Sequence, residues 1–242
     1  MKRFAWIPMM FLLLLAGASA VSAQDVERRT YDVRGFTGLS ASLYGTIHVR
    51  QGDTYAVAIE APARVLNELA VSVEDGLLVL EAKQRGFWDR LFGDGFDDDN
   101  APVATVQMPV INEVAVSGAA DVVGDTPIKT ETLRLSLSGA GSMTLDVAAD
   151  RVTSALSGAG DLILQGTATE HTLRLSGAGE VTAHELKTAR STLTVSGAGD
   201  CSVYATDRLD VTISGVGEVR YKGTPKISQS VSGAGSIEAM DE

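Results

Sequence analysis

Hydrophobic and polar residues alternate in short runs along most of this chain after residue 31. Two examples are residues 46–50 (TIHVR) and 55–59 (YAVAI), in which large apolar side chains fall at every second position. A period of two is typical of a β-strand with one face buried in a core. The pattern therefore predicts an all-β protein, with one short helical turn at residues 63–69.

From residue 111 onward a repeated motif interrupts the alternation. Five of its seven copies read Ser-Gly-Ala-Gly, and the intervals between successive serines are 21, 19, 19, 20, 18 and 18 residues. The seven serines are Ser117, Ser138, Ser157, Ser176, Ser196, Ser214 and Ser232. A repeat this regular indicates that one structural unit is stacked on the next.

The residue before each serine is always Val, Leu or Ile, and an apolar residue also follows most serines at the fifth position. Each unit thus contains a strand, a tight corner and a second strand, with no convincing helix. We predict a right-handed parallel β-helix-like solenoid of about 19 residues per coil, with coils about 4.8 Å apart. Each buried aliphatic side chain in such a spine contributes about 1.5–3 kcal/mol.

The corner motif has a structural explanation. Glycine adopts positive φ without steric cost, and a small residue between glycines lets stacked corners approach closely. We expect the serines to form a hydrogen-bonded ladder that satisfies buried hydroxyls. A nucleophilic serine needs a partnered base, and none of His48, His171 and His184 recurs with the motif, so no catalytic residue is assigned.

The N-terminal third lacks the corner motif. Asp75-Gly76 between two apolar runs indicates a hairpin, and residues 84–102 form an aromatic and acidic loop, either a contact patch or a segment folded against the solenoid. We predict one domain over residues 36–240, with irregular first coils at 36–110 and the seven repeats at 111–240.

The first residues are typical of a secretory signal peptide. Lys2 and Arg3 precede a short apolar stretch, and small residues end at Ala23. We predict cleavage of residues 1–23, a lead segment at 24–35, and export to the periplasm or cell surface. No later segment is apolar and long enough for a membrane-spanning helix.

Charge and cysteine content narrow the possible partners. The formal net charge is −11, and removal of Lys2 and Arg3 changes it to −13. An acidic protein repels the phosphate groups of nucleic acid, so nucleic acid is disfavoured as a partner.

The chain has a single cysteine, Cys201, which excludes an internal disulfide framework. Cys201 falls at an inward position, where we expect it to be buried.

One column of residues is not obviously required for folding. Four residues after successive serines lie Asp161, Glu180, Asp200 and Glu218, which we call the acidic column. These carboxylates could form a cation-binding stripe, because Ca²⁺ prefers oxygen ligands. Alternatively, they line a solvated edge or accept hydrogen bonds from corner amides, which we favour because one carboxylate per coil makes a poor Ca²⁺ cage.

The chain resembles a family of exported bacterial proteins described as "putative auto-transporter adhesin, head GIN domain". The resemblance rests on residues 36–47 with Gly45, on residues 52–57 (GDTYAV), on residues 76–80 (GLLVL), and on the repeated Ser-Gly-Ala-Gly with a following acidic residue. It implies a right-handed parallel β-helix-like domain exported by Gram-negative bacteria, and it implies no established activity or catalytic residues.

These observations lead to one functional prediction with two alternatives. We predict a noncatalytic, adhesin-like interaction module of the cell envelope or surface, without a cofactor, whose partner is an envelope protein or a glycan. The alternatives are a carbohydrate-binding or carbohydrate-active β-helix protein and a scaffold stabilised by cations at the acidic column.

Overall fold

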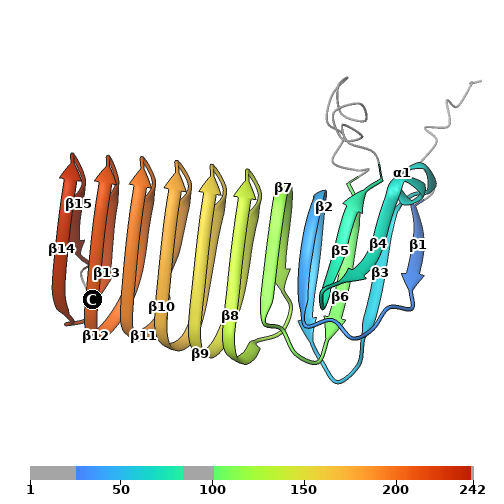
Figure 1. Ribbon diagram of the computed structural model, residues 1–242, viewed down its shortest axis with the longest axis horizontal. Helices are drawn as coiled ribbons and strands as arrows, with labels where there is room; N and C mark the ends of the chain where they lie inside the picture. Colours follow the sequence, from blue (N-terminus) through green and yellow to red (C-terminus); the bar gives the residue numbers. More distant parts are fainter. Residues whose placement is uncertain (1–25, 84–100, 241–242) are drawn as a thin grey trace, which may run out of the picture.

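The computed structural model describes residues 26–83 and 101–240, which form a flattened solenoid with two walls (Figure 1). The repeats form β7 (Glu113–Gly124), β8 (Ile128–Gly139), β9 (Ser142–Gly158), β10 (Asp161–Gly177), β11 (Glu180–Gly197), β12 (Asp200–Gly215), β13 (Glu218–Lys222), β14 (Lys226–Gly233) and β15 (Ser236–Ala239). Each of β9 to β12 contributes its first half to one wall and its second half to the other. This is clearest at β12, whose two halves pair separately with β13 and β14.

Parallel pairing confirms the predicted period of about 19 residues and the solenoid of about seven turns. Ser176 of β10 lies opposite Ser157 on one side and Ser196 on the other, and Leu175 is paired in the same way with Leu156 and Val195. The apolar positions of both walls point inward and form one continuous core. The alternation in the sequence therefore marks the buried side of every repeat strand.

Backbone contacts explain the glycines at the corner. A Cβ atom added to Gly139, whose φ is +134°, would lie 2.0 Å from the carbonyl oxygen of Gly118 in the preceding coil. The amide of Ala140 donates a hydrogen bond of 2.9 Å to that same oxygen. A larger residue at position 139 would thus break the stacking as well as strain the backbone.

The predicted serine ladder is wrong. All seven serines are exposed, and the corner is held by backbone hydrogen bonds such as that from the Ala159 amide to the Gly139 carbonyl, 2.9 Å long. The serine hydroxyls face solvent because the strand alternation turns them away from the core, so water can satisfy them.

The N-terminal section closes one end of the solenoid. It contains β1 (Val26–Tyr31), β2 (Gly38–Gln51), β3 (Ala56–Pro62), α1 (Ala63–Glu68), β4 (Leu69–Glu74), β5 (Leu77–Ala82) and β6 (Val103–Met108). β2 stacks in parallel on β7, whereas the next layers include antiparallel pairs of β3 with β1 and β6, and of β4 with β5. The predicted hairpin and helical turn are confirmed by β4–β5 and α1.

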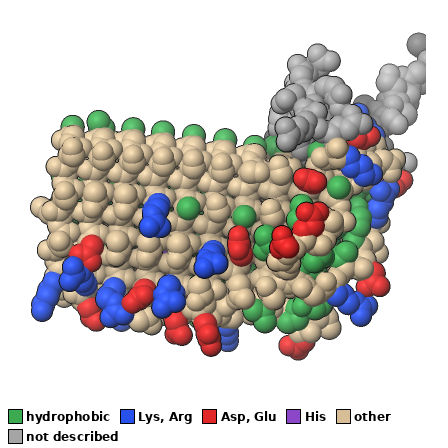
Figure 2. Space-filling view, in the orientation of Figure 1, with side chains coloured by type: hydrophobic (Ala, Val, Ile, Leu, Met, Phe, Trp, Pro, Cys, Tyr) green, Lys and Arg blue, Asp and Glu red, His purple; other side chains and the backbone are tan. Residues whose placement is uncertain are grey.

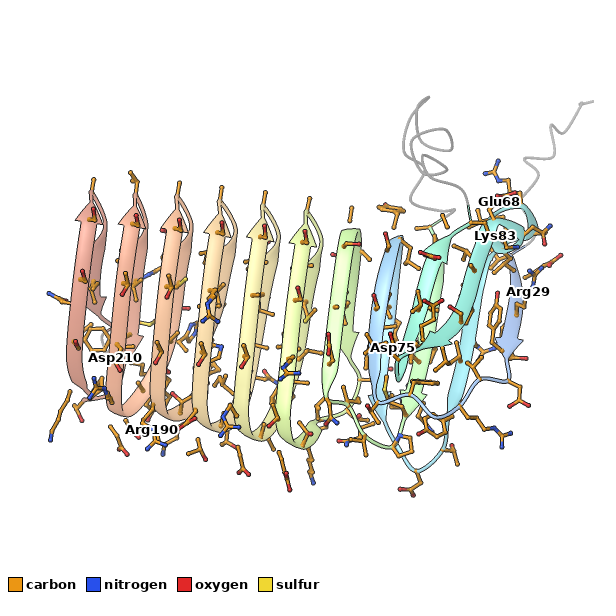
Figure 3. All side chains as sticks on the ribbon, viewed as in Figure 1. Arg29, Glu68, Asp75, Lys83, Arg190 and Asp210 are labelled. Carbon is orange, nitrogen blue, oxygen red and sulfur yellow. The ribbon has the colours of Figure 1, made fainter. Side chains whose placement is uncertain are left out.

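Side chains fasten this end (Figure 3). Arg29 of β1 donates hydrogen bonds to the Leu66 carbonyl and to Asn67 Oδ1, at 3.0 and 3.1 Å. Lys83 reaches the Asn67 carbonyl through its ammonium group and the Glu68 carbonyl through its amide. These contacts satisfy carbonyl groups that the end of α1 would otherwise leave unpaired.

Several predictions concern segments outside the described residues. They are the signal peptide at 1–23, the first two residues of the lead segment at 24–35, and the loop at 84–102 apart from its last two residues. In the described part of the chain, no helix has the length and hydropathy needed to span a bilayer.

Candidate interaction surface

A buried pair of polar residues interrupts the core of the solenoid. Ser154 Oγ lies 3.1 Å from His171 Nε2, and the two residues are 0% and 1% exposed. Burial lowers the pKa of His171 to about 4, so its imidazole is neutral at pH 7. Because both residues are buried, a substrate cannot reach this serine–histidine pair. The hydrogen bond between the two side chains satisfies their polar groups within the core.

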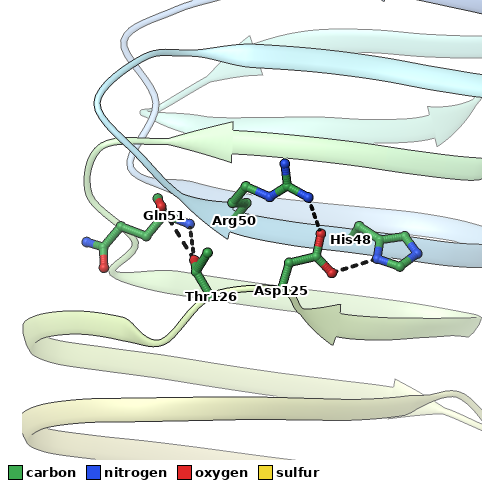
Figure 4. A network of polar contacts seen from close by, with 5 residues as sticks. All are labelled: His48, Arg50, Gln51, Asp125 and Thr126. Atoms are coloured by element: carbon green, nitrogen blue, oxygen red, sulfur yellow. Dashed lines mark hydrogen bonds and ion pairs between the residues drawn. The ribbon is translucent and has the colours of Figure 1, made fainter.

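A second histidine takes part in a network at the junction of β2 and the β7–β8 connection (Figure 4). Asp125 accepts hydrogen bonds of 2.8 Å from His48 Nδ1 and from Arg50. The backbone amide of Gln51 donates a hydrogen bond of 2.8 Å to Thr126 Oγ1. The hydrogen bond from His48, followed by that from Arg50, holds the pKa of Asp125 below its usual value, although burial opposes the shift. The network fastens the first regular coil to the N-terminal section.

The acidic column is in register along the solenoid. Glu180 pairs with Asp161 on one side and with Asp200 on the other. Asp200 Oδ1 accepts a hydrogen bond of 2.9 Å from the Glu218 amide, and Arg220 lies 3.4 Å from Glu218. Asp121, at the same position of an earlier coil, accepts from the Ser142 amide at 2.9 Å. The expectation that corner amides donate to these carboxylates is therefore confirmed at Asp121 and Asp200.

Within the described residues, no three His, Cys, Asp or Glu side chains converge in a way that could hold a metal ion. The members of the acidic column project side by side from successive coils and do not surround a common point. Cys201, beside the column, is buried as predicted. Its burial, and then the charges of Asp200 and Glu180, raise the pKa of the thiol to about 12, so it is not a reactive thiolate.

Charged side chains gather along the edge of the solenoid opposite the glycine corners (Figure 2). Register places Arg151, Glu170, Arg190, Arg208 and Lys226 in one column. Glu170 lies between Arg151 and Arg190, at 3.3 and 2.5 Å, and Arg208 is paired with Asp210 at 2.6 Å. Arg190 is labelled on this edge in Figure 3, whereas Asp210 belongs to the neighbouring column that contains Thr192 and Ser228. Most of these cations are thus neutralised by neighbouring carboxylates.

A flat surface rich in hydroxyl groups covers the wall that leads into the corners. The seven corner serines form one straight column, and two parallel columns beside it contain further Ser and Thr residues. We call this surface the hydroxyl face, and it consists of the seven serines together with Ser136, Thr153, Thr172, Thr192, Thr194, Thr212, Ser228 and Ser230. All seven serines and most of the other members are exposed.

The hydroxyl face differs from the charged edge in the kinds of side chain that it exposes. The wall turned toward the viewer in Figure 2 has few charged or apolar side chains along the repeats. The columns of the hydroxyl face also contain four charged residues, Glu113, Arg134, Arg174 and Asp210, and Arg134 lies directly opposite Glu113. Hydroxyl groups repeated every coil, about 4.8 Å apart, offer donors and acceptors to a broad partner rather than to a small ligand in a cleft.

A family model described as "Putative auto-transporter adhesin, head GIN domain" matches residues 35–225. The chain belongs to this family. Among curated proteins, none matches the chain.

Solved structures agree with the head GIN domain assignment. A putative adhesin from Bacteroides fragilis is 25% identical, with a TM-score of 0.82 over 90% of this chain and 98% of that one. A putative adhesin from Parabacteroides merdae is 19% identical, with a TM-score of 0.65 over 89% and 96%. A putative lipid binding protein from Parabacteroides distasonis is 20% identical, with a TM-score of 0.68 over 90% and 97%. The last two similarities establish the fold alone.

Two features of this head GIN domain were missed from the sequence. The exposure of the serines was misjudged, although their position in the strand alternation places them on the outward side. The Ser154–His171 pair was not recognised, although Ser154 stands in a column with Leu135, Leu173 and Leu193. A polar residue in an aliphatic column is a signal that could have revealed it.

Proposed function

We propose that this head GIN domain is an exported, noncatalytic interaction module that binds a surface of the bacterial cell envelope through its hydroxyl face. Membership of the adhesin-like family supports a surface-interaction role. The observation that carries the proposal is the straight, exposed column of seven corner serines with its flanking Ser and Thr residues. The partner is an envelope protein or a glycan.

The chemistry of the hydroxyl face favours a neutral polar partner. Serine and threonine hydroxyls both donate and accept hydrogen bonds, as do the hydroxyls of sugars and the polar groups of peptides. A flat surface binds through many weak contacts, so affinity depends on the area of contact and on how many repeats take part. The number of stacked coils is therefore part of the proposed binding function.

Paired charge substitutions provide the test. Thr194 and Thr212 are exposed, lie on neighbouring coils of the hydroxyl face, and can accept glutamate without disturbing the core. We expect Thr194→Glu with Thr212→Glu to weaken binding of residues 24–242 to outer-membrane vesicles by about tenfold or more, which corresponds to about 1.4 kcal/mol. Binding is measured by co-sedimentation, and a glycan array identifies whether a sugar is the partner.

A matched control uses the opposite wall. Thr144 and Thr167 are exposed there, so Thr144→Glu with Thr167→Glu adds the same charge without changing the hydroxyl face. We expect this variant to bind as the unaltered protein does, with both variants keeping the original melting temperature. Equal losses of binding in the two variants, or no binding of the unaltered protein to vesicles or glycans, would contradict the proposal.

A further inference from the structure

The strand β14 is the last layer of one wall at the end of the solenoid opposite α1 (Figure 1). It pairs with β12 on one side, and no other described strand covers its second edge. In a parallel sheet, alternate residues of an edge strand direct their amide and carbonyl groups away from the sheet. This edge is therefore able to pair with another strand.

Exposed apolar side chains accompany the free edge. Ile227 and Val231 are 40% and 42% exposed, whereas Leu209 and Ile213, which occupy the same columns one coil earlier, are 0% exposed. The difference arises because no described layer follows β14. A further layer over this strand would bury Ile227 and Val231 as the other members of their columns are buried.

Two of the described free edges, β1 at one end and β14 at the other, differ in charge. The edges of β4 (LAVSVE) and β15 (SIEA) are also unpaired, and each of these strands carries one glutamate. At the opposite end, β1 (VERRTY) carries Glu27, Arg28 and Arg29, and Arg29 is anchored to α1. Charged residues of this kind discourage pairing at an edge. In contrast, Lys226 at the start of β14 (KISQSVSG) is the one charged residue of that strand.

The sequence of β14 is complementary to itself in antiparallel pairing. When Gln229 lies opposite Gln229 of a second copy, Ile227 lies opposite Val231 and Val231 opposite Ile227. Residues directly opposite each other in an antiparallel pair project to the same face of the sheet, so both apolar pairs lie on the core side. Gln229 lies on the same inward side, because it pairs with Val211 of the core, so the two Gln229 side chains meet between the two apolar pairs, where each amide can donate to and accept from the other. A shift by one residue would place Ile227 opposite Ser232.

We propose that two copies of this protein associate end to end through antiparallel pairing of β14, with the two Gln229 residues at the two-fold axis. The interface uses the same strand of both copies, so it closes at a dimer and does not propagate into a filament. Because the pairing extends one wall into the same wall of the second copy, the two hydroxyl faces form one continuous surface. The inference goes beyond the proposed function, since it concerns assembly and not the partner.

Charge substitutions at the two-fold axis test the register directly. We expect residues 24–242 to be dimeric by sedimentation velocity at about 100 µM, and Gln229→Lys and Gln229→Glu each to shift the dimer to monomer because like charges then face each other. An equimolar mixture of these two variants should recover the dimer. As a control, Thr212→Lys adds a charge to the outward side of the preceding coil and should leave the dimer intact.

Cysteine cross-linking provides a second readout that does not depend on weakening the interface. Gln229→Cys should form a disulfide-linked dimer on oxidation, because the two residues face each other, while Cys201 is buried. In Val231→Cys the two new thiols would lie four residues apart along the strand, about 13 Å, too far for a disulfide. A monomeric unaltered protein, a dimer unaffected by Gln229→Lys, or equal cross-linking of both cysteine variants would overturn the proposal.

Discussion

His171 and Ser154 occupy inward positions whose neighbours along the solenoid are mostly aliphatic. Val152 pairs with His171 on one side, and Leu173 pairs with Ser154. The hydrogen bond between the two polar side chains satisfies both within the core, which keeps the cost of burying them small as long as the imidazole is neutral. Protonation of His171 would place an unpaired charge in this apolar environment.

This arrangement predicts that acid destabilises the fold through a single residue. The unfolded chain binds a proton on His171 below about pH 6.5, whereas the folded protein does so only near pH 4, so stability is lost as pH falls between these values. We expect the free energy of unfolding to be about 2 kcal/mol lower at pH 5 than at pH 7 because of His171. Urea denaturation followed by circular dichroism at the two pH values measures this difference.

The control for the acid effect removes both members of the pair. His171→Leu combined with Ser154→Ala leaves no unsatisfied hydroxyl and should show little change in stability between pH 7 and pH 5. If the double variant lost as much stability as the unaltered protein, another group would be responsible for the acid sensitivity.

At the scale of the element, the corner is stabilised by its backbone and by the carboxylates that follow it. Amides of one corner donate to carbonyls of the preceding corner, as in the 2.9 Å bond from Ala178 to Gly158. Asp200 accepts from the Glu218 amide of the next coil. At Asp200, a carboxylate of the acidic column thus bonds to the neighbouring coil without needing a cation.

From this geometry we expect calcium to have no effect on stability. The melting temperature of residues 24–242 should be the same in millimolar Ca²⁺ and in EDTA. Asp161→Asn combined with Glu180→Gln should leave the melting temperature equal or slightly higher, because it removes repulsion between in-register carboxylates, about 1 kcal/mol per pair in water. Scanning calorimetry measures both effects.

The opposite result would support the cation-stabilised scaffold. A melting temperature that rises with Ca²⁺ in the unaltered protein, and that no longer rises in the double variant, would show that the acidic column binds the ion. Mg²⁺ serves as the comparison, since it demands a stricter octahedral geometry than a row of separate carboxylates offers.

Across the whole molecule, the coils share one core and depend on one another. No coil can bury its apolar side alone, so each relies on the layers before and after it. We predict that Leu175→Asp, at a core position 1% exposed, abolishes cooperative unfolding, because it buries an unpaired charge that costs several kcal/mol. Thermal unfolding monitored by circular dichroism reports this loss.

The neighbouring residue provides the control. Arg174 lies on the same strand but is exposed on the other side, so Arg174→Asp should keep a cooperative transition near the original melting temperature. A cooperative transition in Leu175→Asp that matched that of Arg174→Asp would contradict the dependence of the coils on a shared core.

The strands, their buried sides and the stacking of the repeats all follow from the order of the amino acids alone. Two properties are local and repeated, and both can be read without coordinates: the alternation of apolar residues and the glycines that a tight corner requires. The burial of Cys201 and the turn at Asp75-Gly76 follow from the same reasoning, and both are confirmed.

Which distant side chains meet depends on how the coils stack in three dimensions. The Ser154–His171 contact and the Asp125 network link residues whose proximity depends on the register between coils and on the connections between strands. Ser154 lies opposite Leu173 and His171 opposite Val152, so the two polar side chains meet diagonally across the β9–β10 pair, which local patterns do not show. For the same reason, the hydroxyl face became visible only when its columns were placed on one wall.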